Sequence, residues 1–129
     1  MAKQEHLEIL KQGVEAWNAW RAEHRFSADF ANADLSGTDL QGANLRGANL
    51  KDANVSNANL SGADLSKATL SKANLSGANL QRANLRWASL TGANLSKANL
   101  REVDVTGANL RKADLTETDF TNAKGFNGK

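Results

Sequence analysis

The chain has 129 residues and carries 16 Lys and Arg against 14 Asp and Glu, for a formal net charge of +2. It contains no Cys, which excludes disulfide bonds, thiolate metal sites and cysteine nucleophiles together. Charges occur throughout the first 25 residues, and no run approaches the ~18 consecutive apolar residues of a membrane span. We therefore expect a soluble, cytoplasmic protein that does not interact with membranes.

Residues 1–26 have the apolar spacing of an α-helix. One face collects Leu7, Leu10, Val14 and Trp17, at intervals of three or four residues, and Trp20 widens that face. Glycine inside a helix costs ~1 kcal/mol relative to Ala. We therefore expect Gly13 to lie where close packing requires it.

From Phe30 to Phe120 every fifth residue is apolar: these 19 positions hold fifteen Leu, two Phe and two Val. Two residues earlier, 16 of the 19 residues are Ala. In an α-helix this period would wind the leucines around the whole surface, because each unit advances by about 140° net. In a flat strand successive leucines would point to opposite faces, because five is odd. The chain must therefore turn a corner in every unit, so that each Ala-x-Leu faces one common interior.

The two residues after each apolar position are expected to form the centre of a β-turn. At the second of them Gly or Asn occurs 10 times in 19, and both residues tolerate the positive φ of a type II turn. Other residues occupy this place in some units, namely Lys67, Lys72, Arg82, Trp87 and Lys97. There we expect other turn types or local strain.

The tandem motif Ala-(Asp/Asn)-Leu-x-x, from Ala28 to about Asn122, resembles the pentapeptide-repeat protein family. The resemblance implies an all-β solenoid, a right-handed quadrilateral parallel β-helix with twenty residues per coil. Its 19 units would make about 4.75 coils and a rod roughly 23 Å long. Positions twenty apart should stack, so that Asn54, Asn74 and Asn94 form one ladder; side-chain amides stacked at strand spacing can hydrogen-bond along the rod.

Two parts follow from this interpretation: an N-terminal capping helix, residues 1–26, and the β-helix with a short C-terminal tail, residues 27–129. An open solenoid end exposes apolar core and unpaired backbone, so we expect Trp17 or Trp20 to cover Phe30 and Leu35. The stretch Gly13–Arg21 is similar to N-terminal helices of cyanobacterial members. At the other end, Phe126 is expected either to fold over Leu110 and Leu115 or to leave the last coil free to pair with a second molecule. Both a monomer and a dimer through the C-terminal coil thus stay open.

The sequence offers little that would support catalysis. His6 and His24 are interpreted as surface residues, and their spacing indicates neither a metal site nor a catalytic triad. Acidic residues such as Asp34 and Asp64 stand where other units have Asn, so they follow the repeat pattern. We therefore expect no enzyme, cofactor or metal.

Three kinds of function remain. Some members of the resembled family bind type II topoisomerases by mimicking DNA, and a mimic ~23 Å long would need on the order of 13 net negative charges. Residues 27–129 carry 12 bases and 10 acids instead, which disfavours mimicry. Weak nucleic-acid binding through a local basic face is an alternative. The preferred hypothesis is a non-catalytic scaffold for an unidentified protein partner. Its expected contact residues are Arg46, Lys67, Arg86 and Trp87, which fall on the same side of the rod when every twentieth residue is taken as one column. Trp and Arg are enriched at interaction hot spots.

Overall fold

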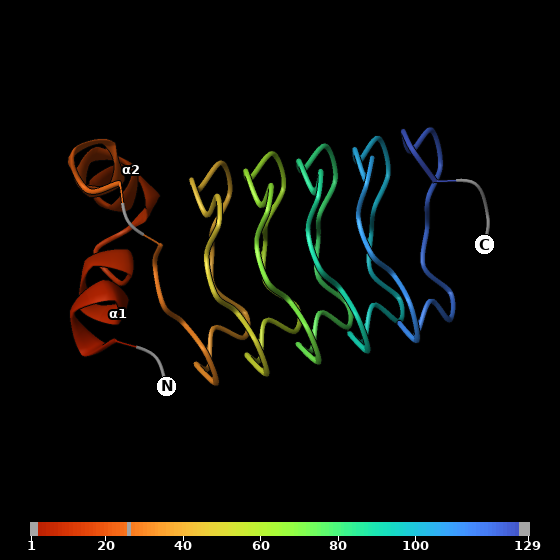
Figure 1. Cartoon of the computed structure of the whole chain (residues 1–129), viewed down its shortest axis with the longest axis horizontal. Helices are drawn as coiled ribbons and strands as arrows, with labels where there is room; N and C mark the ends of the chain where they lie inside the picture. The colour runs from red at the N-terminus through yellow and green to blue at the C-terminus, as the bar shows by residue number, and fades with distance from the viewer. Residues whose placement is uncertain (1–2, 26, 127–129) are drawn as a thin grey trace.

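The computed structural model describes residues 3–25 and 27–126. Residues 1, 2, 26 and 127–129, which belong to the two expected parts of the chain, lie outside the described residues. Two helices, α1 (Gln4–Leu10) and α2 (Val14–Glu23), come first. From Ala28 onward the chain consists of short extended segments and turns that coil into a rod, and the helices lie at its N-terminal end (Figure 1).

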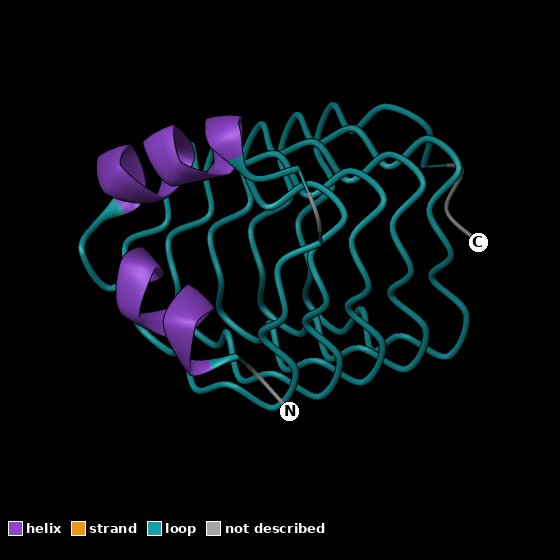
Figure 2. Cartoon of the chain, turned by 60° about the vertical axis from the view of Figure 1, so that its left-hand side comes forward, coloured by secondary structure: helices purple, strands orange, loops and turns teal. Residues whose placement is uncertain are grey.

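The extended segments pair in parallel with a spacing of twenty residues. Bridges join each residue before an apolar position to its counterpart one coil later, from Asp29 and Asn49 to Asp104 and Lys124. A turn follows every fifth residue, so each coil has four sides (Figure 2). The expected stacking of positions twenty apart is confirmed.

The core is a column of leucines with a layer of alanines beside it. Leu80 and Leu85 have no exposed surface, and the neighbouring Ala83 is 1% exposed. This arrangement follows from the turns, because each one redirects the chain so that the next Ala-x-Leu again faces the interior. At the C-terminal end the leucine column is no longer fully buried, because Leu110 and Leu115 are only partly buried.

All 19 residues at the second turn position, from Asn32 to Asn122, have φ between 56° and 73°. Lys67 and Trp87, both at 61°, therefore adopt the same left-handed conformation as the glycines, and the expectation of other turn types was wrong. Every unit closes its turn with the same hydrogen bond, as Ala68 N–H does to the Leu65 carbonyl at 3.0 Å. The last coil keeps this bond and the positive φ although no following coil pairs with it among the described residues, so the turn itself requires the left-handed conformation. A non-glycine residue in this region costs about 1–2 kcal/mol, so the expected local strain is present.

The Asn and Asp residues before each apolar position close their own turns. Asn74 Oδ1 accepts the N–H of Ser76 at 3.0 Å and the hydroxyl of Ser76 at 2.7 Å. Asn54, Asn74 and Asn94 stack as predicted, but among the described residues no hydrogen bond joins their side-chain amides along the rod. The side chain is used locally because it satisfies the turn N–H that points away from the neighbouring coils.

The N-terminal segment forms two helices instead of the single one predicted, since α1 ends at Leu10 and α2 starts at Val14. Gly13 lies in the break with φ 108°. A Cβ added there would have no atom within 4 Å. Glycine is thus needed at position 13 because of the positive φ, and the expectation that close packing requires it was wrong.

The helices occupy hydrogen-bonding positions that a preceding coil would fill. Trp17 is fully buried, its ring centre lies 5.3 Å from that of Phe30, and its Nε1 donates to the Asn44 carbonyl at 2.7 Å. Asn18 Oδ1 accepts the N–H of Asn44 at 2.8 Å. In later coils such backbone groups bond to the coil before them, as Asp64 N–H does to Ala43 O at 3.0 Å. Side chains of α2 therefore substitute for a strand on this side of the first coil.

The other predicted residues of this segment also pack against the core. Leu10 is buried, while Leu7, Val14 and Trp20 are partly buried. Trp20 stacks on Trp17, with ring centres 5.2 Å apart, so Trp17 is the residue that meets Phe30.

His6 belongs to the same interface. It is only 1% exposed, so the prediction that it is a surface residue was wrong. Its Nδ1 accepts the N–H of Asp29 at 3.0 Å. Burial, followed by the nearby charge of Lys3, holds the pKa of His6 below its ordinary value. A neutral imidazole is therefore part of the cover of the first coil.

Candidate interaction surface

The four predicted contact residues lie on one corner of the rod. The twenty-residue period stacks positions 46, 66, 86 and 106, and it stacks positions 47, 67, 87 and 107 beside them. We call these eight residues the Trp87 corner. Backbone hydrogen bonds of 2.9 Å run along it from Gly47 to Ser66, from Lys67 to Arg86 and from Trp87 to Thr106. The corner is therefore held by the same ladder as the core.

Trp87 projects from this corner into solvent. The residue is 58% exposed, and Trp87 is the one large hydrophobic residue in the described part of the chain that is mainly accessible to solvent. The indole lies over Gly107 of the next coil, since a Cβ added to Gly107 would collide with the ring. Glycine at position 107 thus provides the space for the indole.

Three exposed cations accompany this ring: Arg46, Lys67 and Arg86. Arg86 Nε lies 3.8 Å from Asp104 Oδ2. The pKa of Asp104 is held below its ordinary value, mainly because the Thr106 hydroxyl donates to the carboxylate at 2.6 Å. Within the described residues no carboxylate lies within 4.0 Å of a charged nitrogen of Arg46 or Lys67. The corner keeps a positive charge that the protein itself only partly neutralises.

The positive charge continues onto α2 and the residues that directly follow it. Arg21, Arg25 and Arg46 line a surface hollow of about 340 Å³ next to the first coil. Arg21 is fixed there because it donates to the carbonyls of His24 and, at 3.4 Å, of Arg46. The sequence analysis missed Arg21 and Arg25, because it treated the helical segment and the repeats as separate surfaces.

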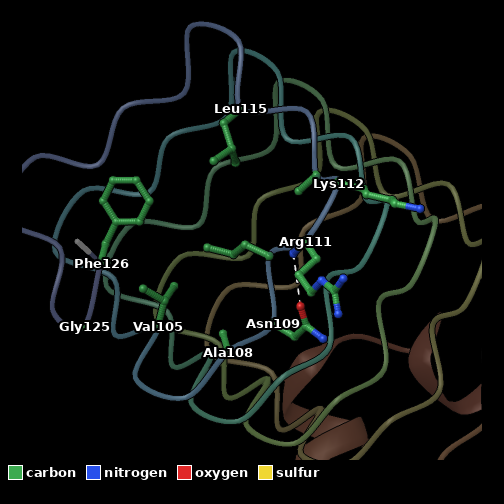
Figure 3. A pocket seen from close by; sticks show the side chains of 10 residues that line it. Val105, Ala108, Asn109, Arg111, Lys112, Leu115, Gly125 and Phe126 are labelled. Atoms are coloured by element: carbon green, nitrogen blue, oxygen red, sulfur yellow. Dashed lines mark hydrogen bonds between the residues drawn. The ribbon is translucent and has the colours of Figure 1, made fainter. Parts of the chain in front are cut away.

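A second feature is a hollow of about 630 Å³ at the C-terminal end, where no further coil follows among the described residues (Figure 3). We call it the C-terminal hollow. Val105, Leu110, Leu115 and Phe126 form its apolar part. The Phe126 ring stacks on Phe120, with centres 3.9 Å apart. Leu110 and Leu115 consequently stay partly exposed.

The part of the chain that the structure describes holds neither a cluster of metal-binding side chains nor a membrane-spanning helix. No group of three His, Asp or Glu side chains there is placed to hold a metal ion. Neither α1 nor α2 has the length and apolarity needed to cross a bilayer.

The comparisons with known proteins agree with this architecture. A family model described as pentapeptide repeats matches residues 28–66, 58–96, 68–107 and 88–124. Among curated proteins none matches the chain.

Solved structures of pentapeptide repeat proteins match the chain as well. One, from the thylakoid lumen of Arabidopsis thaliana, is 34% identical over 73% of this chain, with a TM-score of 0.61, and the match covers 62% of that protein's length. Rfr23 from the cyanobacterium Cyanothece 51142 is 31% identical over 83% of this chain and 96% of its own, with a TM-score of 0.39. The protein alr5209 from Nostoc is 31% identical over 84% of this chain and 83% of its own, with a TM-score of 0.45.

Nothing in these matches indicates a catalytic family. The matched repeats, the twenty-residue register and the four-sided coil agree with one another. The chain therefore belongs to the pentapeptide-repeat family and has its right-handed quadrilateral β-helix fold.

Proposed function

We propose that the protein is a non-catalytic scaffold that binds another protein through the Trp87 corner and needs no cofactor. The observation that carries this proposal is the exposure of Trp87, at 58%, beside three cations on a backbone fixed by hydrogen bonds. An exposed indole next to Arg and Lys offers both apolar area and cation–π contacts to a partner. Arg46, Lys67, Arg86 and Trp87 are the proposed contact residues.

Rigidity supports a scaffold. A rod of about 4.75 coils, with the helices as its N-terminal cap, presents these side chains on a backbone whose N–H groups already have partners. A surface that is ordered before binding loses little conformational entropy when a partner docks. A cytoplasmic location remains a prediction.

DNA mimicry is disfavoured as a function for this chain. Residues 27–129 carry 12 bases against 10 acids, whereas a duplex of this length carries on the order of 13 negative charges. The Trp87 corner, with three cations, has the wrong sign for a topoisomerase surface that accepts DNA.

Capture of partners from an extract of the source cells tests the scaffold proposal. The immobilised full chain should retain a protein that the Trp87→Ala variant does not retain. Arg86→Ala should weaken the same interaction, and Arg101→Ala, an exposed arginine away from the corner, serves as the control. Circular dichroism of all three variants should match the parent. If the captured proteins are the same for Trp87→Ala and for the parent chain, the Trp87 corner is ordinary solvated surface.

A further inference from the structure

One side of the rod carries most of the unbalanced positive charge. It consists of the four stacked segments 46–52, 66–72, 86–92 and 106–112, each of which runs from the Trp87 corner across one flat side to the next corner. We call it the basic face. Its seven bases are Arg46, Lys51, Lys67, Lys72, Arg86, Arg111 and Lys112, and its one acid is Asp52. The rest of the chain holds nine bases and thirteen acids. The near-neutral total therefore conceals a strongly polarised rod.

These seven bases are all exposed. Among the described residues only Arg86 has a carboxylate within 4.0 Å. They stand in two rows along the two corners. Between the rows the outward residues are uncharged, namely Asn49, Thr69, Ser89 and Asn109. The other three sides carry two Asp each at the equivalent positions, whereas this column holds one, Asp29, in the coil before the four segments. The basic face is thus a neutral track with positive charge on both sides.

We propose that the basic face binds an acidic segment of a partner protein, in extended conformation, along the uncharged track. This proposal rests on the proposed scaffold function and gives its partner a chemistry. Side chains of an extended peptide alternate between opposite sides every ~3.3 Å, so acidic residues along it reach both rows of bases. Coils repeat every ~4.8 Å, so the four segments offer about 14 Å of track. Trp87, at the edge of the face, is placed to contact an apolar or cationic residue that interrupts the acidic run.

The same face is less suited to single-stranded nucleic acid. Proteins that bind such strands without sequence preference stack successive bases on several aromatic side chains. The basic face has Trp87 as its one aromatic residue. A nucleic acid strand also carries its charge in a single line of phosphates, whereas the bases here form two rows.

Fluorescence anisotropy with two labelled probes of equal length tests the proposal: a peptide of twelve glutamates and the oligonucleotide dT12. The full chain should bind the glutamate peptide more tightly than dT12, and binding should weaken between low and physiological salt. Lys67→Asn combined with Lys72→Asn should raise the peptide Kd by about fivefold to tenfold, as expected for the loss of two exposed ion pairs. Asn is chosen because it tolerates the left-handed turn position.

Arg82→Asn combined with Lys97→Asn is the matched control. It removes the same charge from the same turn position on other corners, also with φ near 60°, and should change the Kd by less than twofold. Tighter binding of dT12 would overturn the proposal in favour of nucleic acid. No binding of the glutamate peptide, or equal losses for both double variants, would also overturn it. If either occurs while Trp87-dependent capture persists, the scaffold function stands and only the acidic partner chemistry falls.

Discussion

The left-handed turn residues give a prediction whose sign depends on position within the turn. Lys97 occupies a second turn position with φ 60°, which costs a residue with a Cβ about 1–2 kcal/mol. Glycine avoids that cost but loses about 0.5–1 kcal/mol more conformational entropy on folding. At the midpoints of these ranges Lys97→Gly should stabilise the fold by about 0.75 kcal/mol, which is a rise in Tm of about 2–4 °C.

Arg101→Gly is the contrasting change, because Arg101 occupies the first position of the next turn and is not among the residues with positive φ. It removes the same charge but gains no relief of strain, so Tm should fall. Thermal denaturation followed by circular dichroism measures both variants against the parent. A Tm for Lys97→Gly equal to or below the parent's would refute the claim that the left-handed turn stores strain.

Four further predictions concern the core and the two ends. Trp17→Phe should lower the free energy of unfolding, measured in urea, by about 2–4 kcal/mol, because it leaves the Asn44 carbonyl without its donor and opens a cavity. Leu80→Arg should abolish folding, because it buries an unpaired charge in the core. The pKa of His6 is lowered in the folded state. Its contribution to stability is therefore complete above its ordinary pKa of about 6.5 and is lost as the pH falls below that value. The urea midpoints at pH 7.5 and pH 5.5 should differ more for the parent than for the His6→Gln variant. We also propose that the C-terminal hollow pairs two molecules; sedimentation velocity at increasing concentration should show a dimer, and a strict monomer would exclude it.

The repeat was predictable because its cause is local. One large apolar residue in every five, with a small residue two before it, is compatible only with a chain that turns in every unit, and Leu80 and Leu85 are buried as that argument requires. The turn type at Lys67 and Trp87 was not predictable from their side chains. The turn that each unit must make to return Ala-x-Leu to the interior imposes the positive φ there, whatever residue is present.

The surface shows the same division. The sequence placed Arg46, Lys67, Arg86 and Trp87 on one corner, because stacking follows from the period alone. It did not connect that corner with Lys51, Lys72 and Arg111 on the next one, although counting charges by position within the twenty-residue register would have revealed the basic face. The total charge hid it, because acids elsewhere on the rod balance those bases.

The amino-acid sequence by itself determined the repeat, the buried column and the positions that stack, since all three follow from a period in which each unit makes the same contacts. Only the tertiary structure decided what happens where the period stops. At the N-terminal end Trp17, Asn18 and His6 supply hydrogen-bond partners to the first coil. That role depends on how α1 and α2 pack against the coil, and helical periodicity indicates which face is apolar but not which backbone groups its polar atoms will reach.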